Sequence, residues 1–278
     1  MHALVVDTLV GALGLGAREL VSLVGAGGKS AALQRLCREL AAGGNTVIAA
    51  TTTAMFLSQM ADLGPVFTVG EGGDFVTRLR KALVDGRTAA VAQSLGDGGK
   101  VVGLPTPMID RLWAEGLADY FLVEADGSRG MPLKAFGRHE PQVPAATTTI
   151  VEVAGLDALG TALTAEHVHR AQTFATMLSI PIGSLVTERV FADGLRMQLA
   201  QLRQTNAGAR VVLLLNKADG PRGPAMGLAV ARLLEDDGLA STMSSERGRL
   251  AAADRARADS VVIASLYESR FTLATSEG

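Results

Sequence analysis

The sequence predicts an α/β fold of the P-loop NTPase type, in which a mainly parallel sheet carries helices on both faces. Short apolar runs rich in valine, isoleucine and leucine alternate with segments of helical period, as buried parallel strands and their crossover helices do. A glycine-rich loop that ends in Lys29-Ser30 follows one of these runs. Another run, residues 210–215, leads directly into Asn216-Lys-Ala-Asp219. These three observations suggest a nucleotide site at one edge of the sheet.

Composition allows a sizeable core and excludes several classes of protein. The chain has 278 residues, of which 48% are apolar and 32 are glycine, and we expect one domain over residues 1–278. The net charge is −2 and the basic residues are scattered, so we expect no nucleic-acid partner. The single cysteine, Cys37, shares an apolar helix face with leucines, which predicts a core thiol and a cytoplasmic protein without disulfides.

No targeting or membrane segment is expected. The apolar stretch from Leu4 to Ala17 is interrupted by Asp7 and has no lysine or arginine before it, unlike a secretory signal. Elsewhere no apolar run approaches the roughly 18 residues that a membrane span requires. The spacing of Leu4, Val5, Leu9 and Leu13 instead predicts an N-terminal helical arm over residues 1–18.

The remaining elements follow in chain order. Apolar runs predict strands, and segments with a 3.6-residue period predict helices. Glycines 96, 98 and 99 suggest a β-hairpin insertion at residues 88–103, and the polar tail after Phe271 is expected to fray. The expected strands are 20–24, 46–50, 66–69, 119–123, 147–153, 210–215 and 260–264, and the expected helices are 31–42, 75–84, 108–114, 164–178, a stretch within 183–204, and 221–237.

The loop after the first strand is a candidate phosphate cradle. Glycines allow consecutive backbone N–H groups to turn toward an anion, lysine can reach the outer phosphates, and a serine hydroxyl can ligate Mg²⁺. The usual pattern has a glycine where Leu23 stands, and the lysine-first variant of the loop would need a lysine at Val24. The alternative is a glycine-rich turn with an incidental Lys-Ser pair. The candidate cradle residues are Gly25, Ala26, Gly27, Gly28, Lys29 and Ser30.

An acidic pair ends the strand at 119–123. In P-loop proteins a carboxylate at this place holds Mg²⁺, and a following glycine can offer its N–H to the terminal phosphate. Glu124 and Asp126 both remain candidates, because alternation along an extended chain puts them on the same side. We expect Lys29, Glu124 and Asp126 to be catalytic, Ser30 with either acid to hold the metal, and Gly127 to contact the nucleotide.

Two further segments are candidates for a switch or for substrate binding. Residues 128–144 form an irregular loop, punctuated by proline and glycine, that carries Arg129, Lys134, His139 and Glu140. Thr51, Thr52 and Thr53 end the second strand, where open α/β sheets place their ligands. The alternatives are a solvated surface loop and threonines that merely suit a strand end.

The tetrapeptide after the strand at 210–215 is a candidate guanine reader. An aspartate carboxylate accepts two hydrogen bonds from guanine N1 and its exocyclic amino group, a pattern that adenine does not offer. Asp219 would take this role, Asn216 would bond the N7 side, and the Lys217 stem would cover the base. Ser265, at the end of the closing strand, is expected to touch the base as well.

These motifs, together with Pro132-Leu-Lys134 and His139-Glu-Pro141, resemble the selenium-dependent hydroxylase accessory protein family of the YqeC type. The resemblance spans nearly the whole chain and implies a role in the maturation of selenium-dependent molybdenum hydroxylases. The P-loop, Glu124-x-x-Gly127 and Asn216-Lys-x-Asp219 are also similar to those of metallochaperone GTPases. Those proteins often carry cysteine pairs for soft metals, and this chain has none.

The function expected from the sequence is therefore a Mg²⁺-dependent nucleoside triphosphatase, with GTP preferred over ATP, that acts as an accessory factor. Its expected partners are a client molybdenum hydroxylase or cofactor-assembly proteins, and a second copy in a homodimer. One alternative is an ATP-dependent, kinase-like transferase acting on a small molecule. The other is a nucleotide-gated binding scaffold with negligible hydrolysis.

Overall fold

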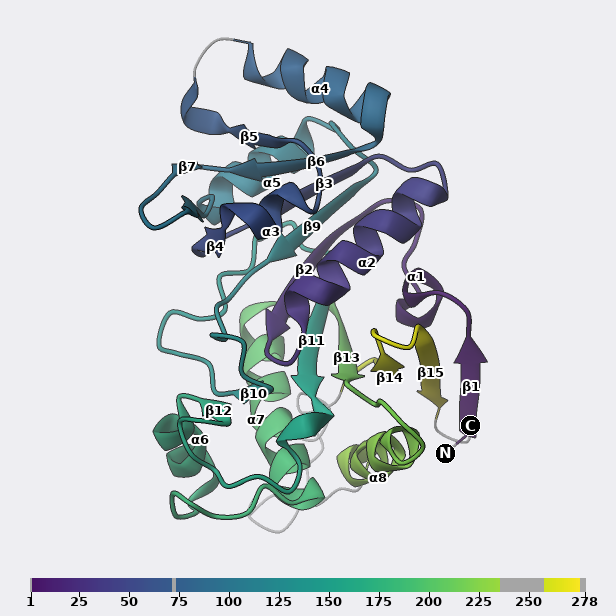
Figure 1. Cartoon of the computed structure of the whole chain (residues 1–278), viewed down its shortest axis with the longest axis vertical. Coiled ribbons are helices and arrows are strands. Elements are labelled where there is room, and N and C mark those ends of the chain that lie inside the picture. The colour runs from purple at the N-terminus through teal and green to yellow at the C-terminus, as the bar shows by residue number, and fades with distance from the viewer. Residues whose placement is uncertain (1, 72–73, 236–257, 276–278) are drawn as a thin grey trace.

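A single large sheet forms the centre of the molecule (Figure 1). The structure is a computed structural model, which describes residues 2–71, 74–235 and 258–275. From β14 to β5 all neighbouring strands are parallel, and β15 and β1 extend the sheet in antiparallel fashion. The predicted α/β class is confirmed. The ten strands lie in the order β1 (His2–Val6), β15 (Arg270–Thr275), β14 (Ser260–Ser265), β13 (Arg210–Asn216), β11 (Thr149–Gly155), β2 (Glu19–Gly25), β9 (Tyr120–Glu124), β3 (Val47–Thr51), β6 (Thr88–Ala92) and β5 (Val66–Thr68).

Helices cover both faces of this sheet. In β2, Val21 and Leu23 belong to one core cluster, whereas Leu20 and Val24 belong to clusters on the opposite face. Because side chains alternate along a strand, a strand buried on both sides needs helices on both sides. The first face is covered by α1 (Leu9–Leu13), α2 (Lys29–Ala42) and α3 (Leu57–Ala61), and the second by α4 (Phe75–Gly86), α5 (Thr106–Ala114), α7 (Glu188–Thr205) and α8 (Gly223–Glu235), with α6 (Ala171–Leu178) against α7.

The cysteine lies in the core of the first face, as expected. Cys37 on α2 is buried in the cluster that also contains Leu33 and Leu36. Burial raises the pKa of its thiol to about 12, so the thiol stays protonated and unreactive.

The expected hairpin insertion is shorter than residues 88–103. Residues 88–92 form β6 and belong to the main sheet, where β6 pairs with β3 and β5. Only β7 (Ser94–Leu95) and β8 (Lys100–Val102) form the hairpin, and β4 (Met55–Phe56) adds a third strand to it. The sequence shows the hairpin turn but not the parallel partners of residues 88–92, because those partners are distant in the chain.

The N-terminal arm is only partly helical, which corrects the prediction for residues 1–18. His2–Val6 form β1, paired over five residues with β15, and only Leu9–Leu13 form a helix. The aliphatic residues of this segment fit both the 3.6-residue period of a helix and the two-residue period of a strand. Pairing with the edge of β15 stabilises the strand.

The C-terminal tail is also ordered further than predicted. β15 continues to Thr275 and lies between β1 and β14. Phe271 within it is fully buried in the main core. A polar tail can form a strand here because two neighbouring strands satisfy its backbone groups.

The helix expected at 164–178 starts late, at Ala171. Arg170, just before it, has a left-handed backbone with φ of 61°, which interrupts a helix. Val168–His169 instead form β12, parallel to β10 (Leu133–Lys134). Two 3₁₀ turns, η1 (Val69–Glu71) and η2 (Leu156–Ala158), complete the described elements.

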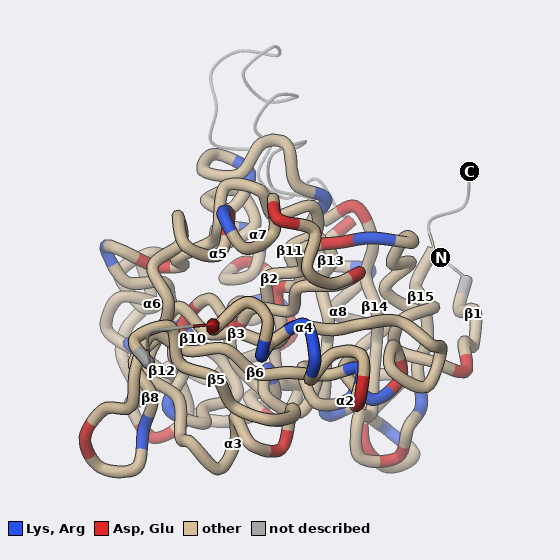
Figure 2. The backbone as a smooth tube through the Cα atoms, turned by 90° about the horizontal axis from the view of Figure 1, so that it is seen from above, with Lys and Arg blue, Asp and Glu red and all other residues tan. Residues whose placement is uncertain are grey.

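Acidic and basic residues are interspersed over the described chain (Figure 2). Among the helices that the structure describes, none combines the length and the apolar character needed to cross a bilayer.

Candidate functional site

The predicted motifs meet at one edge of the sheet. The strands β2, β9, β11 and β13 are neighbours and run parallel, so their carboxyl ends lie together (Figure 1). Each end leads into a segment that carries polar or glycine residues. This edge is where open α/β sheets bind their ligands.

The turn from β2 into α2 has the conformation that its glycines predict. Gly25, Gly27 and Gly28 have φ of 89°, 81° and 127°, values that side-chain-bearing residues rarely adopt. A Cβ atom on Gly27 would lie 2.2 Å from Gly155 N, and one on Gly28 would lie 2.3 Å from Asn216 Nδ2. The loop therefore needs glycine both for its backbone and for its close neighbours.

The first turn of α2 offers amides to an anion. Gly28 is the N-cap and supplies no side-chain hydrogen bond to the helix. Within the described part of the chain, the amides of residues 28–31 have no hydrogen-bond acceptor. Four N–H groups without acceptors at the start of a helix, where the helix dipole is positive, are a suitable cradle for phosphate.

The amides of the preceding three loop residues already donate hydrogen bonds to acceptors within the protein. Gly25 N donates to Asp126 Oδ2 over 2.9 Å, Ala26 N to Val153 O over 2.8 Å, and Gly27 N to Met131 O over 2.9 Å. In this conformation these residues hold the loop in place, and the amides that lack an acceptor in the described chain begin at Gly28.

The two acids after β9 have different surroundings. Lys29 Nζ lies 3.2 Å from Asp126 Oδ1 and donates to Gly25 O over 2.7 Å, and Lys134 Nζ lies 2.9 Å from Asp126 Oδ2. Asp126 is 0% exposed, so this carboxylate is enclosed by two lysines and the Gly25 amide. It organises the loop and does not face an open ligand position.

Glu124 instead lies beside the serine of the loop. Ser30 Oγ donates to Glu124 Oε2 over 3.0 Å. Burial raises the pKa of Glu124, while the charge of Lys29 and the Ser30 hydroxyl partly offset the increase. The carbonyl of Gly127, the residue that directly follows Asp126, accepts a hydrogen bond from Lys134 Nζ.

The Ser30–Glu124 pair fits Mg²⁺ that is held mainly by phosphates. Among the residues that the structure describes, no group of three or more His, Cys, Asp or Glu side chains gathers as a complete metal site. Mg²⁺ in nucleotide sites typically takes only one or two protein oxygens beside phosphates and water. A hydroxyl and a carboxylate oxygen 3.0 Å apart can both reach such an ion.

Part of the 128–144 segment is tied into a buried ionic network. Lys134 is 1% exposed and donates to Gly127 O and Glu140 Oε2 besides its contact with Asp126. Glu140 also accepts two hydrogen bonds from Arg170, from Nη1 to Oε2 over 2.6 Å and from Nη2 to Oε1 over 2.8 Å. Burial alone would raise the pKa of Glu140, but the hydrogen bonds from Arg170 and Lys134 outweigh it and lower that pKa to about 2. Lys134 and Glu140 thus shape the segment, whereas Arg129 and His139 are exposed on it.

The three threonines lie beside the acidic strand end. Thr51 Oγ1 donates to Glu124 O over 3.2 Å and Thr52 N donates to the same oxygen over 3.0 Å. Thr53 N in turn donates to Thr51 Oγ1 over 3.1 Å. Their hydrogen bonds connect the ends of β3 and β9, and Thr53 is the most exposed of the three.

The predicted base-reading residues border the phosphate loop. Asn216 Nδ2 donates to Gly27 O over 2.8 Å, Lys217 Nζ donates to Asp157 Oδ2 over 2.6 Å, and Ser265 Oγ donates to Asp219 Oδ1. A cleft of about 460 Å³ opens among them. It is lined by Gly28, Ala31, Gln34, Arg35, Arg38, Asn216, Lys217, Asp219, Leu266 and Tyr267.

Sequence reasoning missed Glu152, the most unusual residue near the site. It lies in β11 opposite Val24, is 0% exposed, and neither carboxylate oxygen has a hydrogen-bond partner among the described residues. Burial raises its pKa well above the ordinary value, and the charge of Asp126 adds to the increase. A lone charged residue within an otherwise apolar strand was the available signal. Arg170 and Asp157, which complete the networks above, lie far from their partners in sequence and gave no signal.

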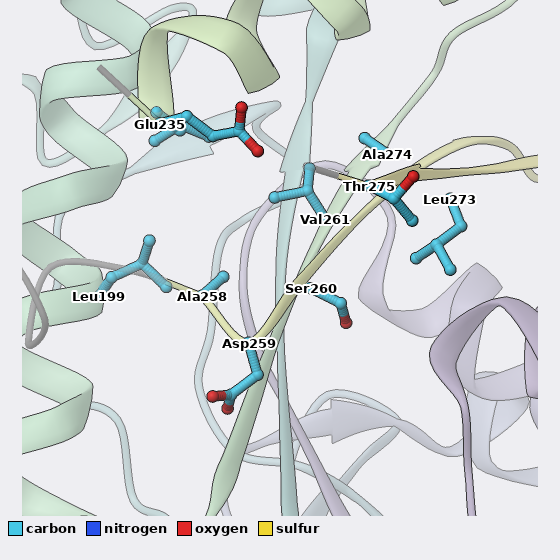
Figure 3. Close-up of a pocket in the computed structure, with 10 residues that line it drawn as sticks. Leu199, Glu235, Ala258, Asp259, Ser260, Val261, Leu273, Ala274 and Thr275 are labelled. Atoms are coloured by element: carbon cyan, nitrogen blue, oxygen red, sulfur yellow. The ribbon is translucent and has the colours of Figure 1, made fainter. Parts of the chain in front are cut away.

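A larger cavity of about 590 Å³ lies away from this edge (Figure 3). It is bordered by the end of α8 and by strands β14 and β15 and includes Glu235 and Ala258, the last described residues on either side of 236–257. None of the predicted site residues lines it.

Comparison with known proteins identifies relatives over most of the chain. A curated relative described as "Uncharacterized protein YqeC", from Escherichia coli (strain K12), is 31% identical over 216 residues, which are 77% of this chain and 82% of the relative. A family model described as "YqeC protein" matches residues 21–172.

Two solved structures superpose weakly on the chain. Signal Recognition Particle 54 kDa protein from Aeropyrum pernix K1, in complex with GDP, has a TM-score of 0.34 and 14% identity and covers 79% of this chain. This chain spans 40% of that protein's length. A GTPase in apo form from Pyrococcus abyssi has a TM-score of 0.36 and 12% identity, with 91% and 92% of the two chains covered. Scores this low carry no argument about function.

The match to the family model rests on sequence similarity over a long segment, unlike the weak structural superpositions. It extends over more than half of the chain, from β2 through the phosphate loop and the acidic strand end to α6, and the curated relative supports it at the level of sequence. This protein therefore belongs to the YqeC family.

Proposed function

We propose that the protein is a Mg²⁺-dependent nucleoside triphosphatase that prefers GTP and serves as an accessory factor in enzyme maturation. The contact between Asn216 Nδ2 and Gly27 O, 2.8 Å long, carries this proposal. It joins the candidate base-reading segment directly to the phosphate loop, so that one nucleotide can occupy both. Two unrelated polar strand ends would have no reason to share a cleft of this size.

The base would lie in the cleft beside Asp219. Ser265 Oγ donates to Oδ1 of this carboxylate, and the second lone pair of Oδ1 together with Oδ2 would accept the two hydrogen bonds from guanine. Leu266 and the stem of Lys217 offer apolar surfaces to the ring. Adenine has no donor at N1, so an ATP base in the same pose would leave the Asp219 carboxylate without its partner.

The phosphates would lie on the amides of residues 28–31. Ser30 and Glu124 would hold Mg²⁺, and Lys29 would leave Asp126 to reach the outer phosphates. Bound Mg²⁺ would supply charge neutralisation between the phosphate groups. Asp126 would keep Lys134 as its partner during this exchange, so its buried charge would stay compensated.

Nucleotide affinity with Mg²⁺ tests this assignment, with GTP and ATP compared for the wild type and for Asp219→Asn. We expect GTP to bind at least about tenfold more tightly than ATP, and the substitution to remove that preference because an amide cannot accept both guanine hydrogen bonds. Lys29→Ala should lose affinity for both nucleotides by roughly a hundredfold. Lys81→Ala, an exposed lysine on α4, is the matched control. Equal affinity for ATP in the wild type would contradict the guanine assignment.

The client remains part of the proposal. The family resemblance suggests a selenium-dependent molybdenum hydroxylase or its cofactor-assembly proteins. Reconstitution of such a hydroxylase from purified components, with and without this protein and GTP, would test it. An identical yield of active enzyme in both reactions would remove the client assignment and leave the nucleotide assignment standing.

A further inference from the structure

The turn between β14 and β15 carries the most exposed aromatic side chain that the structure describes. Of the two tyrosines in the chain, Tyr120 is 4% exposed, whereas Tyr267 is 91% exposed. Tyr267 lines the cleft beside the phosphate loop, together with Lys217 and Asp219 of the candidate base-reading segment. An aromatic ring that borders a cleft and is open to water offers a large apolar surface to a ligand.

The turn is tied to the base-reading segment on one side. Leu266 N donates to Asn216 Oδ1 over 3.4 Å, and Glu268 N donates to Ser265 Oγ over 2.9 Å. Ser265 Oγ in turn donates to Asp219 Oδ1. The residues on either side of Tyr267 are therefore connected to the groups that border the cleft.

The other side of the turn is held by α2. Arg35 Nη1 donates to Ser269 Oγ over 2.7 Å, and the Arg35 guanidinium lies over the ring of Phe271, 5.3 Å from its centre. Among the residues that the structure describes, by contrast, no hydrogen bond or ring contact engages the Tyr267 side chain. An anchored turn thus presents a free ring at the mouth of the cleft.

The cleft provides two kinds of surface for a nucleotide base. A purine has polar edges and flat apolar faces, so its site needs hydrogen-bonding groups for the edge and apolar or aromatic groups for the faces. The Asp219 carboxylate can serve the edge. The stem of Lys217 lines the cleft and is held there because its Nζ donates to Asp157 Oδ2 over 2.6 Å. Tyr267 supplies the only aromatic ring among the described residues that line this cleft.

We propose that Tyr267 is a base-stacking residue, whose ring covers one face of the purine that Asp219 holds by its edge. This inference rests on the proposed function. Stacking uses the π face that every base has, so Tyr267 would add affinity without selecting guanine. Selection would come from Asp219, and the two residues would contribute separately to binding.

Affinities for three ligands test this role. GTP, ATP and inorganic triphosphate, each with Mg²⁺, are titrated into the wild type and its variants in a calorimeter. We expect Tyr267→Ala to bind both GTP and ATP roughly tenfold more weakly, with their ratio unchanged. Tyr267→Phe keeps the ring and should stay within about twofold of the wild type. Triphosphate has no base and should bind Tyr267→Ala as it binds the wild type.

Another exposed aromatic residue provides the matched control. Phe56 on β4 is 49% exposed and does not line the cleft. Phe56→Ala should therefore leave the affinities for all three ligands unchanged.

Chemical labelling gives a readout that does not depend on affinity. Because Tyr120 is buried, nitration of the native protein with tetranitromethane should modify Tyr267 first. Saturating GTP with Mg²⁺ should protect Tyr267, since the base would cover its ring. Saturating triphosphate should leave the rate of nitration unchanged.

The outcomes separate this inference from the proposed function. Equal GTP affinity in the wild type and Tyr267→Ala, unprotected nitration with GTP bound, or an equal loss of triphosphate affinity in Tyr267→Ala would overturn the stacking role alone. A wild type that binds GTP no more tightly than triphosphate has no base site, which would overturn the proposed function and the stacking role together. If ATP bound as tightly as GTP and Tyr267→Ala weakened both, the guanine assignment would fall and the stacking role would stand.

Discussion

Asp126 and Glu124 show how two neighbouring acids acquire different roles. Alternation along the strand puts them on the same side, and from sequence alone they are equivalent candidates for the metal. In the structure Asp126 is enclosed by Lys29, Lys134 and the Gly25 amide, whereas Glu124 contacts Ser30. The difference arises because Lys134 returns to the site from a separate strand. Asp126 therefore orders the loop, and we propose Glu124 as the acid that would contact Mg²⁺.

Glu152 gives a prediction about stability. Its pKa is raised by burial, so between the ordinary value of 4.5 and that raised value the folded chain keeps a proton which the unfolded chain loses. Stability must then fall as pH rises through this window, by about 1.4 kcal/mol per pH unit for one such group. Glu152→Gln removes the penalty. We expect the variant to have a higher free energy of unfolding than the wild type at pH 7, measured by urea unfolding.

The pH dependence distinguishes this effect from simple repacking. The advantage of Glu152→Gln should shrink to within about 0.5 kcal/mol at pH 4, where the acid is protonated in both states. The exposed residue Glu166 provides the control, since Glu166→Gln should change stability little at either pH. A variant that is less stable than the wild type at pH 7 would contradict the predicted burial of an unpaired acid.

The phosphate loop as an element depends on contact with β13 as well as on its glycines. Gly28 and Gly44 both have positive φ, at 127° and 89°. A Cβ on Gly28 would lie 2.3 Å from Asn216 Nδ2, whereas one on Gly44 would meet nothing within 4 Å. Gly44→Ala should therefore cost about 1 kcal/mol from backbone strain alone. Gly28→Ala should cost more, because the Asn216 contact must also shift.

Nucleotide binding separates the two glycine variants. We expect Gly28→Ala to lower nucleotide affinity at least about tenfold, since the Gly28 amide begins the proposed phosphate cradle and Asn216 contacts both this loop and the proposed base cleft. Gly44→Ala should keep wild-type affinity. Titration with a fluorescent GTP analogue checks both, and equal affinities would show that the contact between Gly28 and Asn216 does not position the loop.

The two ends of the chain close one edge of the whole molecule. β1 pairs with β15 over five residues, and β15 pairs with β14 (Figure 1). Removal of residues 1–6 would leave β15 as an unprotected edge and lose the backbone hydrogen bonds between the two strands. We expect a loss of roughly 2–5 kcal/mol in the free energy of unfolding and an increased tendency to aggregate.

A single substitution within β1 is the control for this truncation. Leu4 is 59% exposed, so Leu4→Ser keeps the backbone pairing and removes little buried surface. Its effect on unfolding should stay within about 0.5 kcal/mol. If the truncated protein were as stable as Leu4→Ser, the pairing of β1 with β15 would contribute nothing to the fold.

Much of the fold could be predicted because its signals are local. The buried strands of the parallel sheet, the phosphate loop and α2 appear in the sequence as continuous runs, and the structure places each within a few residues of its expected position. The wrong assignments lie at the ends of the chain, at residues 88–92, which form β6 of the main sheet, and near residue 170. There β1, β12 and β15 exist only because a distant strand offers them an edge, and such pairing leaves no periodicity of its own.

The α/β class, the family and the residue types that can hold a nucleotide follow from short segments of sequence, since glycines, a lysine and acids stand there in fixed spacing. Which of these groups remain free to bind a ligand depends on tertiary contacts. Lys134 forms ion pairs with Asp126 and Glu140, and Glu140 also pairs with Arg170. Glu124 accepts a hydrogen bond from Ser30, and Arg129 has no partner in the described chain. Charge compensation depends on which side chains meet in space, and these partners come together only when β9, β10 and β12 assemble at one edge of the sheet.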